Sequence, residues 1–228
     1  MKTEDGLSST ESGGRNAGVS ANSQTAPRSV FRVPDSTLIH RLASITEPLS
    51  MERVFIRPQP VEVELGSGDG SFLVRYAERH PDRNFLGVER LLGRLRKIDR
   101  KALRASLANL RLMRIEASYF LEYLLPRASA TALHVYFPDP WPKRKHRKNR
   151  LINASFPDLA RRVLAPGGTV YLRTDDTDYF LQMNTSFAAQ AGFVQMGTPP
   201  ELRELLTDFE RDFHSRGIKT LHAAYRRT

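Results

Sequence analysis

Short apolar runs alternate with longer amphipathic segments along most of the chain. We predict strands over 61–65, 84–88, 110–115, 131–137, 168–174, 193–197 and 219–226. We predict helices over 70–79, 91–107, 118–125, 151–164 and 177–191, with short helical turns within 200–214. Five successive strand–helix units indicate an α/β fold in which helices cover both faces of a mostly parallel sheet. The last two strands have no full crossover helix between them, so we expect an antiparallel pair at one edge. Pro166-Gly167-Gly168 predicts a tight turn into the fifth strand.

The two ends of the chain differ in composition. Residues 1–30 are rich in Ser, Gly, Asn and Thr, and we predict a disordered tail because they cannot bury enough apolar surface. Residues 31–228 fit a single domain with its core in 61–228. No apolar run reaches the length of a membrane span, and the N-terminus lacks a signal-peptide pattern, so we expect a cytoplasmic protein.

The chain contains no cysteine, which excludes disulfides, thiolate zinc sites and cysteine nucleophiles. Its six histidines show no short ligand spacing, and we expect no metal site. The formal net charge is +10. Because the charges of residues 1–30 cancel, the excess belongs to 31–228 and points to a polyanionic partner.

The densest positive charge lies in residues 143–150, which hold six Lys/Arg in eight positions. We expect phosphate contacts from Arg144, Lys145, Arg147, Lys148 and Arg150. A solvated charge run is the alternative.

A proline-rich segment, Phe137 to Pro142, comes directly before that run. Each proline fixes its own φ and pushes its predecessor toward extended conformations. Asp139, between two prolines, is therefore predicted on a stiff loop at the carboxyl end of the fourth strand, where ligands of such sheets bind. Trp141 either stacks on a nucleic-acid base or packs in the core.

The first strand runs into the sequence Glu-Leu-Gly-Ser-Gly-Asp-Gly at 64–70. Gly66 and Gly68 let the backbone approach a ligand and turn into a helix. The acids Glu64 and Asp69 flank this turn, where a dinucleotide would place its pyrophosphate. Their charge instead suits the sulfonium and amino groups of S-adenosylmethionine.

Two more acids end the next strands. Glu89 follows Gly66 by 23 residues, a position from which a carboxylate accepts ribose hydroxyls. Glu116 ends the third strand, within reach of an adenine amino group. The alternative for Glu116 is a surface acid.

Together these residues resemble the bacterial tRNA (guanine-N7)-methyltransferase family, from about Val61 to Tyr225. The resemblance rests on Phe-Pro-Asp-Pro-Trp-Pro-Lys at 137–143 with the basic run, Leu-Gly-Val-Glu at 86–89, Thr-Asp at 174–175, and Thr-Asp-Phe-Glu at 207–210. It implies a Rossmann-like class I methyltransferase fold, S-adenosylmethionine as methyl donor, and N7 of a guanine in the tRNA variable loop as acceptor.

Residue by residue, the resemblance implies that Glu64, Glu89, Glu116 and Asp139 line the cofactor site, with Asp139 as the catalytic candidate. On the substrate side it implies Lys143, Asp175, Thr207, Asp208, Phe209 and Glu210. Glu116 stands where the family often has Asp.

Three other functions are compatible with parts of this pattern. A methyltransferase acting on an exocyclic amine places a short Pro-containing motif at the same strand end, commonly with the acceptor before two prolines. An RNA-binding protein without catalysis would need only the basic run. A dinucleotide oxidoreductase is opposed by the acids at the glycine turn and by the Gly-x-Gly-x-Gly spacing.

Overall fold

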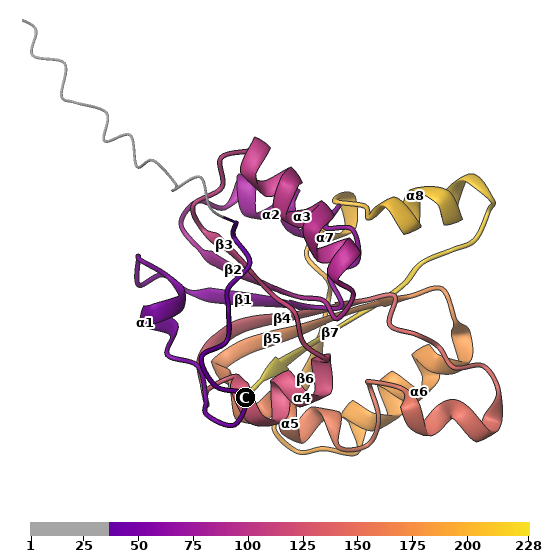
Figure 1. Cartoon of the computed structure of the whole chain (residues 1–228). Helices are drawn as coiled ribbons and strands as arrows, with labels where there is room; N and C mark the ends of the chain where they lie inside the picture. The colour runs from indigo at the N-terminus through magenta and orange to yellow at the C-terminus, as the bar shows by residue number, and fades with distance from the viewer. Residues whose placement is uncertain (1–36) are drawn as a thin grey trace, which may run out of the picture. The chain divides into compact units, whose positions relative to one another are not determined.

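The computed structural model describes residues 37–228 and has one seven-stranded sheet (Figure 1). The strands are β1 Val61–Leu65, β2 Asn84–Val88, β3 Leu110–Met113, β4 Ala130–Tyr136, β5 Leu164–Thr174, β6 Phe193–Met196 and β7 Leu221–Arg227. Their order is β3-β2-β1-β4-β5-β7-β6, and β7 runs antiparallel to both of its neighbours. The predicted parallel sheet and the antiparallel pairing of the last two strands are confirmed. The disorder predicted for 1–30 lies outside the described residues.

Helices cover both faces of the sheet, as predicted. They are α1 Met51–Val54, α2 Leu73–Arg79, α3 Leu92–Arg104, α4 Ala117–Tyr119, α5 Phe156–Val163, α6 Thr177–Ala188, α7 Pro200–Glu204 and α8 Asp208–Ser215. A π-helical turn, η1 Phe120–Leu124, continues α4, and a 3₁₀ helix, η2 Arg144–Asn149, follows β4. Figure 1 shows α2, α3 and α7 on one face and α4, α5 and α6 on the other. Because both faces are covered, β1 and β2 are buried along their whole length.

Three elements differ from the prediction. The helix expected over 118–125 is one α-helical turn followed by η1, and the helix expected over 151–164 begins only at Phe156. The turn expected at Pro166-Gly167-Gly168 is an irregularity inside β5, whose pairing with β4 jumps from Leu164 to Thr169. Proline cannot donate to the ladder and Gly167 has φ +77°, so the chain bulges there without ending the strand.

The strand order reverses between β1 and β4. The chain proceeds outward from β1 to β3 on one side and from β4 to β5 on the other. Ligands of open α/β sheets bind in the crevice at such a reversal, beyond the carboxyl ends of the strands. Leu65 and Tyr136 end the two strands at this point. Across residues 37–228, no helix combines the length and apolar character that crossing a bilayer requires.

Candidate active site

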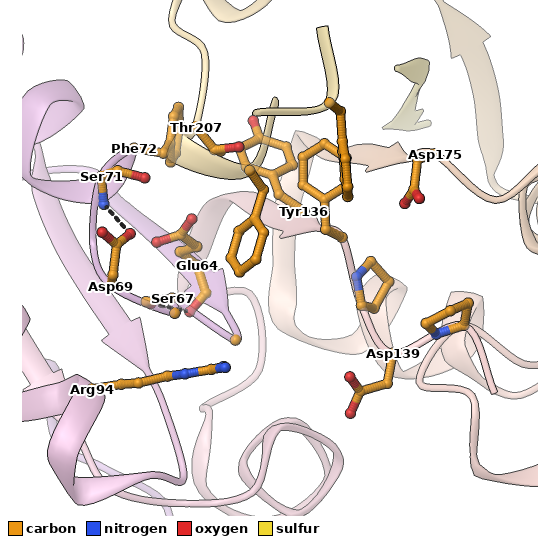
Figure 2. Close-up of a pocket in the computed structure, with 17 residues that line it drawn as sticks. Glu64, Ser67, Asp69, Ser71, Phe72, Arg94, Tyr136, Asp139, Asp175 and Thr207 are labelled. Carbon is orange, nitrogen blue, oxygen red and sulfur yellow. Dashed lines mark hydrogen bonds between the residues drawn. The ribbon is translucent and has the colours of Figure 1, made fainter. Parts of the chain in front are cut away.

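Two adjoining cavities lie at the carboxyl ends of β1, β2 and β4, with volumes of about 370 and 330 Å³. Figure 2 shows the larger one, called the β1–β4 cavity below. The smaller, called the β2–β3 cavity, extends toward Glu89 and Glu116. Both are lined by Gly66, Arg94 and residues 136–139. Asp139 therefore stands where the two cavities meet.

The glycine turn forms one wall of the β1–β4 cavity. Gly66 and Gly68 have φ of +80° and +55°, and a Cβ added at Gly66 would meet no atom within 4 Å. The backbone is thus open to a ligand at this point, as predicted from the sequence. Gly70 has a different role, because a Cβ there would lie 2.7 Å from the Ile98 side chain. It allows close packing of the turn against α3.

Glu64 is the most unusual group of the site. Its side chain lines the β1–β4 cavity although the residue is only 4% exposed, and its Oε2 has no hydrogen-bond partner. Burial raises the pKa of Glu64 to about 8. A buried carboxylate oxygen without a hydrogen bond is costly. A cationic ligand in the cavity would supply the missing partner, which fits the amino group of S-adenosylmethionine.

Asp69, on the same wall, is already paired. Lys101 lies 2.8 Å from its Oδ2, and the Ser71 N–H donates to Oδ1 at 3.1 Å. Partial burial opposes ionisation, but these bonds outweigh it and lower the pKa of Asp69. Because Lys101 compensates its charge, Asp69 gives no electrostatic argument against a pyrophosphate at this turn.

Glu89, at the end of β2, is hydrogen-bonded to the glycine turn at the end of β1. It accepts hydrogen bonds from the N–H of Gly68 at 3.1 Å and of Leu91 at 2.8 Å, and it is buried. These bonds orient the carboxylate at the wall of the β2–β3 cavity. Each carboxylate oxygen keeps a further lone pair, so Glu89 can still accept hydroxyl groups.

Glu116 also lines this cavity, and it caps α4 by accepting from Ser118 and Tyr119. Partial burial works against its ionised form, but these hydrogen bonds prevail and lower the pKa of Glu116. The apolar side chains of Leu91 and Ile115 line the same cavity. A cavity with apolar walls and two acids is suited to an adenosine group.

The loop that carries Asp139 has an unusual backbone. Phe137 and Trp141 have φ of +52° and +43°, and each precedes a proline. The extended conformation predicted for residues before proline is therefore wrong at these two positions. Such left-handed residues cost about 1–3 kcal/mol each and persist only when their surroundings hold them. The Phe137 N–H donates to the Arg173 carbonyl at 2.9 Å, and the Trp141 ring stacks on His146 with an interplanar angle of 8°.

The carboxylate of Asp139 itself is exposed and has no hydrogen bond or ion pair with any residue of 37–228. It projects from the rigid loop at the junction of the cavities (Figure 2). An acid held by backbone strain, with a free carboxylate, is suited to meet a charge that develops on a ligand.

Arg150 anchors this loop from inside the protein. Its guanidinium donates to the Pro140 carbonyl at 2.7 Å, to Asp178 at 2.7 Å and to Gln182 at 2.8 Å, and the residue is 2% exposed. The prediction that Arg150 contacts phosphate is therefore wrong, because its donors are buried and engaged. Arg147 shares Asp178 at 3.1 Å. The other cations of the run are exposed, namely Lys143, Arg144, Lys145 and Lys148.

The segment 207–213 forms the wall opposite the glycine turn. Thr207, Phe209 and Phe213 line the β1–β4 cavity together with Asp175 from the end of β5. Thr207 also caps α8, accepting from the N–H of Glu210 at 3.0 Å.

Glu210 lies behind that wall instead of in the cavity. It is fully buried, forms an ion pair with Arg173 at 2.6 Å, and accepts from the Thr207 N–H at 2.8 Å. The structure thus does not place Glu210 where a substrate could reach it. Asp208 and Lys143 also lie outside the lining of both cavities. The remaining predicted residues of the site come together at the cavities: Glu64, Gly66, Gly68, Glu89, Glu116, Asp139, Asp175, Thr207 and Phe209.

Residues 58–223 match the family model described as "Putative methyltransferase". The tRNA (guanine-N(7)-)-methyltransferase of Geobacter metallireducens is 33% identical over 189 residues, which are 81% of this chain and 90% of that protein. The protein of the same name from Chromohalobacter salexigens is 36% identical over 184 residues, 77% of this chain and 73% of that protein. The chain belongs to the tRNA (guanine-N(7)-)-methyltransferase family. The resemblance noted in the sequence is confirmed.

Solved structures similar to this methyltransferase confirm its fold class. The 16S rRNA methyltransferase KamB aligns with a TM-score of 0.55 and 20% identity, covering 78% of this chain and 91% of that one. The structure of an antibiotic-related methyltransferase aligns with a TM-score of 0.52 and 16% identity, covering 80% and 94%. At these identities the likeness concerns the class I methyltransferase fold alone.

Two residues of this methyltransferase site were missed in the sequence. Arg94, in the first turn of α3, lines both cavities and is a cation among acids. Its position five residues after Glu89 was the available signal. Tyr136 also lines both cavities. Its hydroxyl bonds to His134 Nδ1 at 2.8 Å, and His134 Nε2 lies 2.7 Å from Glu62, so the ring is fixed from behind. Within 37–228, no group of three or more His, Asp or Glu side chains could hold a metal ion.

Proposed function

We propose that the protein transfers the methyl group of S-adenosylmethionine to N7 of a guanine in the variable loop of tRNA. One observation carries the proposal. The buried carboxyl of Glu64, whose Oε2 has no hydrogen-bond partner, faces the same cavity as Asp139, and the loop of Asp139 leads directly into exposed cations. The first feature suits a cationic cofactor, and the last suits an RNA backbone. The names of the relatives support the choice of tRNA and of guanine N7.

The two cavities together suit the cofactor. Glu64 would receive its amino group, Glu89 the ribose hydroxyls and Glu116 the adenine amine, while the open backbone at Gly66 and Gly68 leaves room for the methionine part. When bound, S-adenosylmethionine supplies an electrophilic methyl group on a sulfonium.

The acceptor atom requires positioning more than acid–base chemistry. Guanine N7 carries an in-plane lone pair and no proton, so no general base is needed. Positioning of reactants alone can supply about 7–11 kcal/mol of the barrier. Phe137, Phe209 and Phe213 form an aromatic wall of the β1–β4 cavity, and Phe137 lies 5.6 Å from Phe213 between ring centroids. This wall is suited to receive an extruded base.

Positive charge develops on the guanine ring as its N7 gains the methyl group. The Asp139 carboxylate would stabilise that charge or accept hydrogen bonds from the Watson–Crick edge of the base. Asp175 lines the same cavity and is a second acceptor for the guanine N1–H and exocyclic amine. Adenine has no N1–H, so these acceptors would favour guanine.

The RNA backbone would lie along the exposed cations at 143–148. Contacts to phosphate fix register and depend on salt but carry no sequence information. Lys143 is the cation of this run nearest in sequence to Asp139, and we assign it to the substrate nucleotide.

Methyl transfer from labelled S-adenosylmethionine to bulk tRNA tests the proposal. The product is treated with borohydride and aniline, which cleave the chain at N7-methylguanine. A single cut in the variable loop is the expected result. Labelling without cleavage would move the target to another atom, such as an exocyclic amine, and refute the N7 assignment. Cofactor binding without labelling of any tRNA would refute tRNA as the acceptor. Asp139→Asn serves as the site variant and Asp158→Asn, an exposed acid on α5, as the matched control.

A further inference from the structure

Helix α3 concentrates positive charge outside the basic run. Its 13 residues include six cations and a single acid, Asp99. The cations are Arg94, Arg96, Lys97, Arg100, Lys101 and Arg104. Asp99 does not balance them at the surface, because it is buried and accepts from the Leu38 N–H at 2.7 Å and the Thr37 hydroxyl at 2.9 Å.

Most of these cations have no partner within residues 37–228. Lys101 is paired with Asp69, whereas Arg94, Arg96, Lys97, Arg100 and Arg104 make no hydrogen bond or ion pair with any described residue. Like charges three or four residues apart on a helix are destabilising by about 0.2–0.5 kcal/mol per pair. Arg96 with Arg100, and Lys97 with Arg100, are such pairs. Repulsion between these cations thus destabilises the helix, and an anionic partner would remove that repulsion.

The helix lies beside the active site. Arg94 lines both cavities, and Figure 2 shows its side chain reaching from α3 toward the loop of Asp139. The β2–β3 cavity is lined by Arg90 and Arg94, by Trp141, and by Asn149 of the basic run. The cavity therefore borders both cationic segments. From Arg94 to Arg104 the helix adds a strip roughly 15 Å long.

The apolar residues of α3 decide which kind of anion fits. Leu95, Ile98 and Ala102 are buried, and no apolar side chain of the helix is fully exposed. Apart from Gly93, its exposed residues are the cations Arg94, Arg96, Lys97, Arg100 and Arg104. A helix that binds a lipid surface needs an exposed apolar face as well as its cations. Arginine, which dominates this face, matches phosphate geometry with two parallel hydrogen bonds.

We infer that the exposed face of α3 is a second RNA-binding surface, which holds phosphates of the substrate tRNA on the side of the active site away from residues 143–148. This inference rests on the proposed function for the identity of the RNA. The two cationic surfaces grip the backbone on both sides of the nucleotide whose base enters the β1–β4 cavity.

The test compares two triple variants with equal loss of charge. The first, Arg96→Gln/Lys97→Gln/Arg100→Gln, leaves the cavity-lining Arg94 and the paired Lys101 intact. The control is a second triple variant that neutralises exposed cations at the opposite end of the sheet. It consists of Arg53→Gln, Arg127→Gln and Arg226→Gln. Binding of a tRNA transcript to the full chain is measured from 50 to 300 mM salt, together with the affinity for S-adenosylmethionine.

For the α3 variant we expect a shallower dependence of log Kd on log salt, by about 0.7–0.9 for each phosphate that the variant no longer binds. At 0.1 M salt this corresponds to a rise in Kd of roughly five- to eightfold per phosphate. Its affinity for S-adenosylmethionine should stay at the wild-type value, which also shows that the fold is kept. The control variant should match the wild type in every measurement.

An unchanged salt dependence in the α3 variant would overturn the inference. An equal change in the control variant would do the same, because the effect would then follow net charge alone. Anionic vesicles serve as a third probe, and a larger loss of vesicle binding than of tRNA binding would refute RNA as the partner. Methyl transfer by the wild-type protein is measured in a separate assay. If no methyl transfer occurs but the α3 variant still binds tRNA more weakly, the proposed reaction is wrong and the RNA-binding surface is supported.

Discussion

Replacing Glu64 tests the electrostatics of the proposed cofactor site most directly. In the cofactor-free protein, burial raises the pKa of this carboxyl to about 8. The amino group it would meet has a pKa of about 7.7–8.0 when free in water. Binding needs the carboxylate and the ammonium together. Below pH 8 the protein must release a proton from Glu64, and above pH 8 the amine must gain one.

The affinity for S-adenosylmethionine should therefore pass through a maximum near pH 8. With pKa values of about 8 for Glu64 and 7.8 for the amine, both groups are in the binding form in ~20% of encounters at pH 7.9. The fraction of encounters with both groups in the binding form is ~0.8% at pH 5.9 and at pH 9.9. The affinity therefore falls about 25-fold over two pH units on either side of the maximum.

Isothermal titration calorimetry from pH 6 to 10, in buffers of different ionisation enthalpy, measures both the affinity and the protons exchanged. Glu64→Gln should lose about 10- to 100-fold in affinity near pH 8, the value of a hydrogen bond to a charged group. It should also lose the acid limb of the profile. Glu116→Gln is the matched control, because hydrogen bonds already lower the pKa of Glu116 and it stays ionised over this range. That variant should keep the acid limb.

An affinity that is constant between pH 6 and 8, without proton release, would refute the reasoning. The carboxyl of Glu64 would then be ionised before the cofactor arrives or would not meet its amino group. Retention of the acid limb in Glu64→Gln would assign the titration to another residue.

Three further predictions follow from the site. Asp139→Ala should lower turnover by about 10²–10³, the scale of one preorganised electrostatic group, and near-normal single-turnover rates would remove Asp139 from its role. Arg150→Gln should lower turnover by loosening the loop but leave the salt dependence of tRNA binding unchanged. Lys148→Gln should instead make the slope of log Kd against log salt shallower by about 0.7–0.9, and equal slopes for the two variants would contradict the buried position of Arg150. Glu210→Gln leaves the charge of Arg173 buried without a counterion, so urea unfolding should show a loss of about 3–5 kcal/mol, and a loss below 1 kcal/mol would count against the ion pair.

Several features of the site could be predicted from the sequence because they depend on neighbouring residues. The glycine turn at 66–70 and the acids that end β1, β2 and β3 follow from strand periodicity and turn chemistry. The stiff loop at Asp139 follows from two prolines, although the left-handed φ of Phe137 and Trp141 does not. Phe137 is held by a hydrogen bond to Arg173, which is distant in the sequence, and Trp141 by stacking on His146 of the basic run.

Whether a charged side chain is free to meet a ligand depends on residues far away in the sequence. Arg150 and Lys148 look alike in the sequence, yet one is buried against Asp178, 28 residues away, and the other is exposed. Glu210 belongs to the motif that predicted substrate contacts, but it is paired with Arg173 of β5, 37 residues earlier. Lys101 compensates Asp69 across a separation of 32 residues.

The amino-acid sequence was therefore enough to predict the succession of strands and helices, the position of the glycine turn and the acids at the strand ends. These depend on local periodicity and backbone preference. Long-range packing leaves Oε2 of Glu64 without a hydrogen bond and the Asp139 carboxylate free, and it buries Arg150 and Glu210 in ion pairs. The free energy of a charge depends on its burial and on its counterion, and both are set by residues brought together from distant parts of the chain.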